Sequence, residues 1–280
     1  MMPRAYFSIA IVCTVTLVSA CSSGTKFYTK AAPSESSFAR QQLRYARVRD
    51  ARQATQARVE QMFADRNIRY PAAELFIRIF KWEKELEVWV RPVDKKKFEL
   101  LKTYDVCAMS GIVGPKSRRG DKQVPEGFYS VGVFNPVSTF YLSLGVDYPN
   151  QRDRAANKGR SNLGGDIFIH GGCRSDGCIA ITDDGISELY WLAVEARGLG
   201  QQTIPVHIFP ARMDDDAEMK KLERLYQKKP AVIAFWQSLV PGYEFFEKKR
   251  QLPYVTVDVF GAYRIADGPA SGDADRGERR

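Results

Sequence analysis

The alternation of apolar and polar side chains that begins at residue 75 constrains the fold more than any other feature. The segment LFIRIFKWEKELEVWVRP has the two-residue period of β-strands and is rich in Ile, Phe, Trp and Val, with Glu83-Lys84-Glu85 as its turn. Further strand-like segments follow, namely KKKFELLKTYDVC, FYSVGVF, TFYLSLGV, DIFIH, TIPVHIFPAR and PYVTVDVF. A chain of 280 residues can bury a sizeable core. We therefore predict a β-sheet scaffold.

Helices and long loops are predicted around these strands. The segment DDGISELYWLAVEARGLG should form a helix that is capped by Asp183 or Asp184 and ends at Gly198. Its inward-facing residues would be Ile186, Leu189, Tyr190 and Ala193. Two more helical segments are DDDAEMKKLERLYQKK and AVIAFWQSLVPGYEFFEKKRQ. The segments SGIVGPKSRRGDKQVPEG and YPNQRDRAANKGRSNLGG are dense in Gly, Pro and charge, and such loops often carry binding and catalytic groups.

The first twenty residues have the layout of a secretory signal, with Arg4 followed by the uncharged run AYFSIAIVCTVTLV. The run ends in VSAC, which resembles the bacterial lipobox, in which a diacylglyceryl group is attached to the cysteine, here Cys21. By the same resemblance, Ser22 favours sorting to the outer membrane. We predict a lipid-anchored protein of the bacterial envelope that faces the periplasm. A plain signal with a chance cysteine is the alternative.

A polar tether over residues 22–38 precedes a basic segment. Residues 39–66 contain no Gly or Pro and are predicted to be helical, with a weak apolar stripe of Leu43, Ala46, Ala54, Ala57, Met62 and Phe63. The arginines of this segment include Arg40, Arg44, Arg47, Arg49, Arg52 and Arg58. They would suit anionic lipid headgroups or glycan-linked carboxylates, but a solvated spacer helix is the favoured interpretation. The formal net charge of +9 agrees with an anionic partner without identifying one, and no nucleic acid partner is expected.

The cysteines point to one reactive thiol. Cys13 would leave with the signal and Cys21 would be lipidated, so that Cys107, Cys173 and Cys178 remain. An odd number of thiols in an oxidising compartment leaves a candidate reactive thiol. One hypothesis is a disulfide between Cys107 and Cys173 that leaves Cys178 free.

The segment IFIHGGCRSDGCIAITD brings a histidine and that cysteine close together in sequence. A thiol attacks a carbonyl carbon well only as thiolate, and histidine suits the task of removing its proton because its pKa lies near neutral pH. His170 ends a predicted strand, and the flexible turn after it could fold Cys178 back beside the imidazole. Gly177 would let backbone N–H groups point at a developing oxyanion. Ser175 could orient the turn or the imidazole.

Two other interpretations of these residues remain open. The cysteines could be small buried hydrophobic residues, which fits Cys107 better than Cys178. They could also bind zinc together with His170, with Cys107 or His207 as the fourth ligand. The spacing lacks the paired Cys-x2-Cys of structural zinc sites, and we predict no metal and no cofactor. His207 lies in an alternating segment and is predicted to be structural.

IHG followed by SDGCIAITD resembles the signature of the L,D-transpeptidase catalytic domain, the YkuD-type family of bacterial cell-wall enzymes. TYDVCAMSGIVGPKSRRGDKQVPEGFYSV, NPVSTFYLSLGVDYPNQRDRA and GQQTIPVHIFPARM resemble its murein transpeptidase (YafK-like) branch. The resemblance covers about residues 75–265. By position, Cys178 matches the family's nucleophile and His170 its general base. Ser175, Gly177 and Cys178 match its Ser-x-Gly-Cys core.

The resemblance implies an α+β fold, in which a β-sandwich-like core with peripheral and N-terminal helices bears the site in a groove. It implies a peptidoglycan L,D-transpeptidase without cofactor, in which Cys178 attacks the carbonyl of the third stem-peptide residue, diaminopimelate. The acyl acceptor would be another stem peptide or a lysine of an envelope lipoprotein. Most of the family has a longer insertion and a second histidine where this chain has Asp176. What orients His170 is therefore left open.

The flanking loops supply candidates for the substrate groove. Cations that could meet stem-peptide carboxylates are Lys116, Arg118, Arg119, Lys122 and Arg174, and Gln123, Tyr141 and Tyr148 could line the cleft. Two alternative functions are a hydrolase of the same fold that cuts cross-links or releases a lipoprotein, and a non-catalytic peptidoglycan-binding lipoprotein. The predicted organisation is a signal peptide (1–20), a tether and basic helix (21–70), a catalytic domain (71–212), a C-terminal helical extension (213–264) and a disordered tail (265–280).

Overall fold

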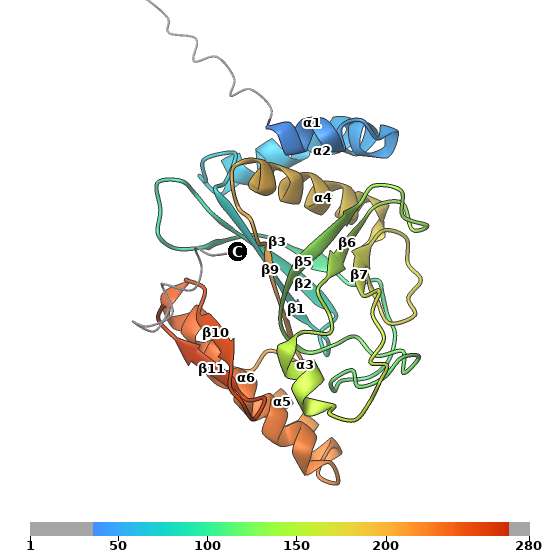
Figure 1. Cartoon of the computed structure of the whole chain (residues 1–280). Helices are drawn as coiled ribbons and strands as arrows, with labels where there is room; N and C mark the ends of the chain where they lie inside the picture. Colours follow the sequence, from blue (N-terminus) through green and yellow to red (C-terminus); the bar gives the residue numbers. More distant parts are fainter. Residues whose placement is uncertain (1–35, 269–280) are drawn as a thin grey trace, which may run out of the picture. The chain divides into compact units, whose positions relative to one another are not determined.

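The structure, a computed structural model, describes residues 36–268 (Figure 1). The predicted signal peptide, the lipid attachment at Cys21 and most of the predicted tail lie outside the described residues. The last strand continues to Ala266, and so includes the first two residues that the sequence assigned to the tail.

In the described part of the chain, nine strands form one sheet in the order β3-β2-β1-β9-β5-β6-β7-β8-β4. Their bounds are β1 Glu74–Phe80, β2 Glu85–Arg91, β3 Glu99–Asp105, β4 Ala108–Met109, β5 Gly127–Asn135, β6 Ser143–Val146, β7 Phe168–His170, β8 Ile179–Ala180 and β9 Pro205–Phe209. The β1–β9 and β7–β8 pairs are parallel, and the other pairs are antiparallel. The predicted α+β class is confirmed, as are the strand segments read from alternation.

Six helices and a separate hairpin complete the described residues. They are α1 Ser37–Gln42, α2 Ala46–Asp65, α3 Gln151–Ala156, α4 Thr182–Gly198, α5 Asp216–Leu225, α6 Pro230–Lys249, and the strands β10 Tyr254–Val257 and β11 Tyr263–Ala266. The sequence did not predict α3 or β11. Within residues 36–268, no helix combines the length and hydrophobicity needed to cross a bilayer.

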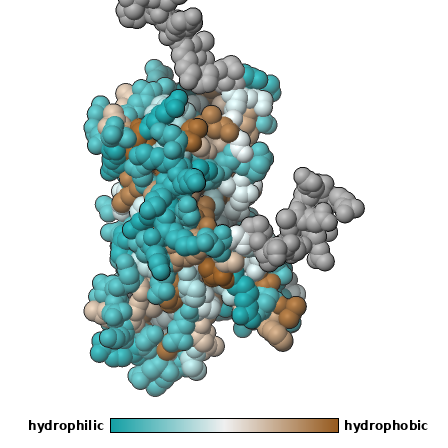
Figure 2. Space-filling view, turned by 90° about the vertical axis from the view of Figure 1, so that its left-hand side faces the viewer, coloured by the Kyte–Doolittle hydropathy of each residue, from teal (hydrophilic) through white to brown (hydrophobic). Residues whose placement is uncertain are grey.

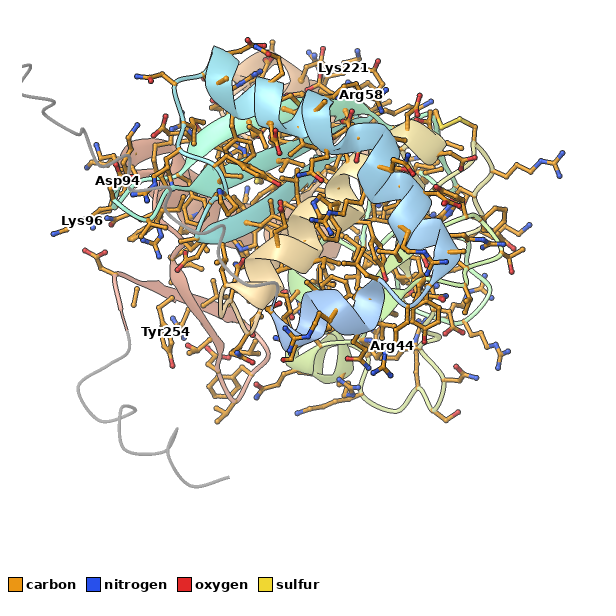
Figure 3. All side chains as sticks on the ribbon, turned by 90° about the horizontal axis from the view of Figure 1, so that it is seen from above. Arg44, Arg58, Asp94, Lys96, Lys221 and Tyr254 are labelled. Carbon is orange, nitrogen blue, oxygen red and sulfur yellow. A yellow bond between two sulfur atoms is a disulfide. The ribbon has the colours of Figure 1, made fainter. Side chains whose placement is uncertain are left out.

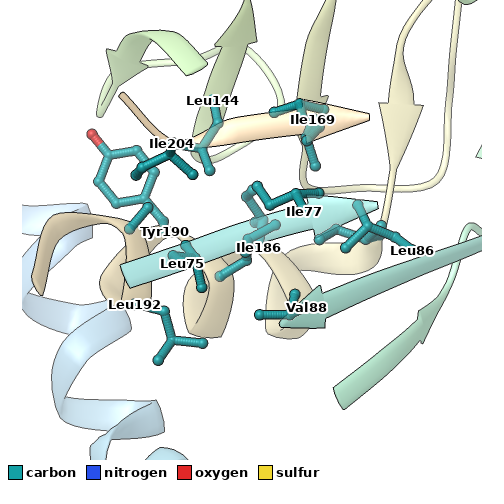
Figure 4. Close-up of a cluster of buried hydrophobic side chains, with 14 of the residues drawn as sticks. Leu75, Ile77, Leu86, Val88, Leu144, Ile169, Ile186, Tyr190, Leu192 and Ile204 are labelled. Atoms are coloured by element: carbon teal, nitrogen blue, oxygen red, sulfur yellow. The ribbon is translucent and has the colours of Figure 1, made fainter. Parts of the chain in front are cut away.

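Strand β1 is buried on both faces, and its apolar side chains point alternately into separate hydrophobic clusters on the two faces. Leu75, Ile77 and Ile79 belong to a cluster that includes residues of α4, as Figure 4 shows for Leu75 and Ile77 beside Ile186 and Tyr190. Phe80, which follows Ile79 and points to the opposite face, belongs to a second cluster with α6 residues. Successive side chains of a strand point to opposite faces, so α4 and α6 cover opposite faces of the sheet. Figure 2 shows a face of the molecule where hydrophilic residues predominate and hydrophobic ones are scattered.

The prediction of a solvated spacer helix is wrong, because α2 packs on the core. It contacts α4 and buries Val48, Ala51, Thr55, Val59 and Phe63, which recur at helical spacing. Of the predicted apolar stripe, only Phe63 is fully buried. The true stripe contains Ala and Thr and gives a weak signal in the sequence. Most of the arginines are exposed, among them Arg44 and Arg58, which Figure 3 labels.

The predicted cap of α4 is wrong in detail. The N-cap position is Ile181, and neither Asp183 nor Asp184 caps the helix with its side chain. The Asp183 carboxylate instead accepts a hydrogen bond of 2.8 Å from the Gly172 N–H, in the turn after β7. Burial of the four inward-facing residues and the end of the helix at Gly198 are confirmed. The start of α4 is therefore attached to the segment that contains the candidate nucleophile.

Candidate functional site

The parallel pairing of β7 with β8 sets the geometry of the site. Ile169 pairs with Ile179 and His170 pairs with Ala180, so that Cys178 lies one residue before β8 and level with Phe168. Since strand residues two apart share a face, the register directs the side chains of Cys178 and His170 to the same side of the sheet. The link between the strands is short, and its glycines at 172 and 177 adopt φ values of 66° and 98°, which favour glycine.

The thiol of Cys178 is half-buried and free of any disulfide. Its Sγ lies 3.4 Å from the carbonyl oxygen of Asp166, which can accept the thiol proton in a hydrogen bond. Burial raises the pKa of Cys178, and the carboxylates of Asp166 and Asp176 act in the same direction. The Phe168 N–H and the Lys116 ammonium oppose that pKa rise, since both stabilise the thiolate.

The imidazole of His170 is held in one tautomer. It is 2% exposed, and its Nδ1 lies 2.6 Å from the carbonyl oxygen of Gly171. A carbonyl accepts only, so Nδ1 carries the proton and Nε2 presents a lone pair. Within residues 36–268, Nε2 has no hydrogen-bond partner. Burial lowers the pKa of His170, against the effect of the Gly171 hydrogen bond. A neutral imidazole with a free Nε2 can accept a proton from a thiol.

Phe140 completes the surroundings of His170. Its ring stacks on the imidazole with a centroid distance of 4.6 Å and an interplanar angle of 24°. The question of what orients His170 is thus answered by the Gly171 carbonyl and the Phe140 ring. Sequence reasoning missed Phe140, because it lies in a loop far from the motif and no pattern marks it.

Two serine hydroxyls organise the turn before Cys178. Ser175 Oγ accepts the Cys178 N–H at 3.1 Å and donates to the Cys178 carbonyl at 2.7 Å, so that it orients the turn and not the imidazole. Ser110, which sequence reasoning missed, accepts the N–H of Gly177. The two amides expected to meet an oxyanion are thus hydrogen-bonded to these hydroxyls in this structure.

The hypothesis of a disulfide between Cys107 and Cys173 is confirmed. The bond removes both sulfurs from any set of metal ligands, and the zinc interpretation is therefore wrong. Within residues 36–268, no group of three or more His, Cys, Asp or Glu residues is placed to hold a metal ion. His207 lies in the core, as predicted, with ring centroids of Phe76 and Phe128 at 4.6 and 4.8 Å. Burial lowers its pKa to about 3.

The groove candidates differ in their environments. Lys116 is buried, with Nζ at 2.5 Å from Asp121 Oδ1 and 3.0 Å from the Arg118 carbonyl oxygen, and it acts electrostatically on Cys178. Gln123 uses its side-chain oxygen to accept the Ile112 N–H at 3.1 Å. The remaining candidates comprise the exposed Arg118, Arg119, Lys122 and Arg174, the half-buried Tyr141 and the buried Tyr148. Lys116 is thus the candidate that the fold brings near the thiol.

A cavity of about 540 Å³ lies in the loop that leads to Asp166. Its lining contains Arg154, Lys158 and Arg160 and no carboxylate. The loop packs on the one that contains Lys116, since the Arg119 N–H donates to the Asn162 carbonyl at 3.2 Å. Sequence reasoning pointed to the segment YPNQRDRAANKGRSNLGG, which contains these lining residues, but singled out none of them.

Comparison with known proteins gives matches along most of the chain. Residues 88–208 match the L,D-transpeptidase catalytic domain, YkuD. The Escherichia coli K12 protein named "Putative L,D-transpeptidase YafK" is 39% identical over 194 residues, which are 69% of this chain and 74% of that protein. Its counterpart in Escherichia coli O157:H7 matches to the same extent.

Solved structures give weaker matches. The helical cell shape determining protein Pgp2 from Campylobacter jejuni aligns with 66% of this chain and 73% of its own, at 20% identity and a TM-score of 0.38. Bd1075 from Bdellovibrio bacteriovorus aligns with 62% of each chain, at 21% identity and a TM-score of 0.34. At these TM-scores neither likeness bears on the chemistry of the site.

Proposed function

The chain belongs to the family of L,D-transpeptidase (YkuD) catalytic domains, and from this we propose that it is a peptidoglycan L,D-transpeptidase with Cys178 as its nucleophile. The single observation that best supports the proposal is the placement of Cys178 and His170 on one side of paired parallel strands, with Nε2 of the imidazole unoccupied within the described residues. Ser175 and Gly177 support the turn.

In the proposed first half-reaction, His170 Nε2 takes the thiol proton, and the Cys178 thiolate attacks the carbonyl carbon of the third stem-peptide residue, diaminopimelate. The bond to the nitrogen of the terminal D-alanine breaks, and His170 returns the proton to that leaving amine. The result is a thioester on Cys178. The Phe168 N–H and the charge of Lys116 favour the thiolate that starts this sequence.

In the second half-reaction, an acceptor amine attacks the thioester carbonyl, His170 takes one of its protons, and the thiolate leaves. An amine of another stem peptide or of a lipoprotein lysine would make this a transfer, while water would make it a hydrolysis. The Gly177 and Cys178 N–H groups can donate hydrogen bonds to the oxyanion once their hydrogen bonds to the hydroxyls of Ser110 and Ser175 are broken. The cationic side chains that line the cavity in the loop leading to Asp166 can form ion pairs with the carboxylates of the stem peptide.

Purified muropeptides test this function. We expect cross-linked dimers from the wild-type protein. Cys178→Ala and His170→Gln should each lose activity by about 10³-fold or more, because the first has no thiol and the second has no group to take up and return the thiol proton. Asp184→Ala, an exposed change on α4, is the control and should keep wild-type rates. Shortened or detached stems without dimers would identify a hydrolase. Unchanged products from Cys178→Ala would refute the nucleophile.

The predicted lipid anchor at Cys21 and the outer-membrane location belong to the same proposal, and they rest on the N-terminal motif alone. An envelope position would bring the site to its polymeric substrate.

A further inference from the structure

We propose that Arg47 of α2 is a positioning residue for His170 and that it acts through Phe140. The inference rests on the proposed role of His170 as general base. It assigns to the N-terminal helix a part in catalysis, although α2 is about 120 residues from His170 in sequence and precedes the matched catalytic domain.

Arg47 holds the loop that carries Phe140. Its Nη1 donates to the carbonyl oxygen of Ser138 at 2.5 Å and to that of Tyr141 at 2.9 Å, so that the two acceptors flank Phe140 in the chain. Tyr141 has a φ of 72°, a conformation that a residue with a Cβ adopts at an energetic cost. A fixed partner on the Tyr141 carbonyl helps to keep the backbone in this conformation.

The loop contacts the imidazole in two ways. The Phe140 ring stacks on His170, and although Phe140 is 41% exposed, it covers an imidazole that is almost completely buried. The Phe140 carbonyl also accepts the N–H of Gly171 at 3.1 Å. The carbonyl of that same Gly171 accepts the proton of His170 Nδ1. Displacement of Phe140 would therefore remove the ring that stacks on the His170 imidazole and would also disturb the Gly171 carbonyl, which fixes the imidazole tautomer.

The helix provides a rigid support for Arg47. The next residue, Val48, is buried against the core, and Ala51 follows one turn later. Because α2 packs on α4, and α4 in turn binds Gly172 through Asp183, the helix layer is connected to the catalytic segment at two points, through the Phe140 loop and through Gly172. Exchange of Arg47 removes one point of this contact without changing the packing of α2.

A double-mutant cycle on the full chain tests the inference with Arg47→Ala, Phe140→Leu and the combined variant. One readout is turnover of muropeptides, and the other is the rate at which iodoacetamide alkylates Cys178 between about pH 6 and pH 9, followed on the peptide that contains it. Alkylation needs no substrate. The charged and polar groups that face the thiol are Asp166, Asp176, Lys116 and the Phe168 N–H, and all of them are unchanged in these variants.

We expect each single variant to lower kcat by about 5- to 20-fold with little change in KM, because a small misplacement of a catalytic group lowers the rate of the chemical step. The combined variant should be no worse than the more affected single variant, because both changes break the same connection. Arg47→Lys, which keeps a donor, should restore part of kcat. Arg66→Ala, at the C-cap of α2, where Arg66 Nη1 donates to the Met62 carbonyl of the same helix, is the matched control.

The inference would be overturned if the fold-losses in kcat of the two single variants multiplied in the combined variant. It would also be overturned if Phe140→Leu kept the wild-type kcat and the wild-type rate of Cys178 alkylation. A lower thermal midpoint with unchanged kcat in Arg47→Ala would show a structural role alone and would overturn it too. Failure of the proposed function has a different signature, since the wild-type protein would then form no product, and His170→Gln would leave the alkylation of Cys178 unchanged.

Discussion

Burial raises the pKa of two carboxyl groups away from the candidate site. The pKa of Glu195 on α4 rises to about 7, and that of Asp153 on α3 rises to about 6. The Glu195 carboxyl accepts a hydrogen bond from the Tyr70 hydroxyl, and its other oxygen has no partner within residues 36–268. Each group therefore favours the folded state while protonated, and this contribution is lost as the pH rises through the folded pKa.

Glu195→Gln should stabilise the protein above neutral pH and have little effect in acid. The wild-type carboxyl gives its full stabilisation below its unfolded pKa of 4.5 and loses it as the pH rises to about 7, whereas the amide does not ionise. The gain in the free energy of unfolding near pH 8 should be about 1–3 kcal/mol. Urea unfolding near pH 4 and pH 8 measures it, with the exposed Glu244→Gln as control. An equal effect at both pH values would contradict the assignment.

At this scale, sequence reasoning identified the residues whose chemistry is local in sequence. His170, Cys178 and Ser175 lie within one short motif, and the odd number of cysteines indicated that one thiol would be free, which is Cys178. It missed Phe140 and Ser110, since both reach the site by tertiary folding. The Gly171 carbonyl was also missed, because a backbone group leaves no mark in a sequence.

Among the elements, α6 supports the loop over residues 110–126. Glu126 is buried, and its carboxylate lies 3.1 Å from Lys81 Nζ and accepts the Trp236 indole N–H of α6 at 2.7 Å. Lys81 Nζ also donates to the carbonyls of Gly114 and Val124 at 2.8 and 2.7 Å. The loop that contains Lys116 is thereby joined both to the end of β1 and to the C-terminal helix.

Trp236→Phe should weaken this support while it keeps most of the packing. The change leaves one buried oxygen of Glu126 without its donor, which should cost about 1–3 kcal/mol of unfolding free energy. Urea unfolding measures the loss. Trp82→Phe, at a partly exposed indole, should stay within about 0.5 kcal/mol of wild type. Equal stability of Trp236→Phe and the wild type would show that the indole hydrogen bond contributes little.

Strong periodicity made the strands and the longer helices predictable, and weak periodicity explains the errors. The two-residue alternation of β1 and β2 and the inward face of α4 were read correctly. The buried side of α2 was not, because alanine and threonine in a stripe give little contrast with their neighbours. Helix α3 is short and lies in a segment whose Gly and charge content is typical of loops.

Over the whole molecule, the disulfide joins two distant parts of the chain. Cys107 follows β3 and Cys173 lies in the turn after His170, at a sequence separation of 66 residues. The bond therefore restricts the conformations of the unfolded chain as well as those of the turn in the folded protein. The packing of α2 on α4 likewise connects the predicted N-terminal segment to the predicted catalytic domain, whose boundary at residue 71 stays a prediction.

Loss of the disulfide should lower global stability. For a closed loop of this length, chain-entropy arguments give about 4 kcal/mol. We expect the Cys107→Ser/Cys173→Ser double variant to lose an amount of that order in urea unfolding, and the wild type to lose a similar amount after reduction. Cys178→Ser is the matched control, since this cysteine is not in a disulfide. If a reductant lowered the unfolding free energy of the double variant as much as that of the wild type, its effect would be unrelated to this bond.

The spacing between the proposed nucleophile and the proposed base is set by main-chain ladder bonds between β7 and β8, which hold whatever side chains surround them. Loops that do not touch this pair can then diverge, acquire charge or change their acyl partner without moving it, whereas the loop of Phe140, which stacks on His170, cannot.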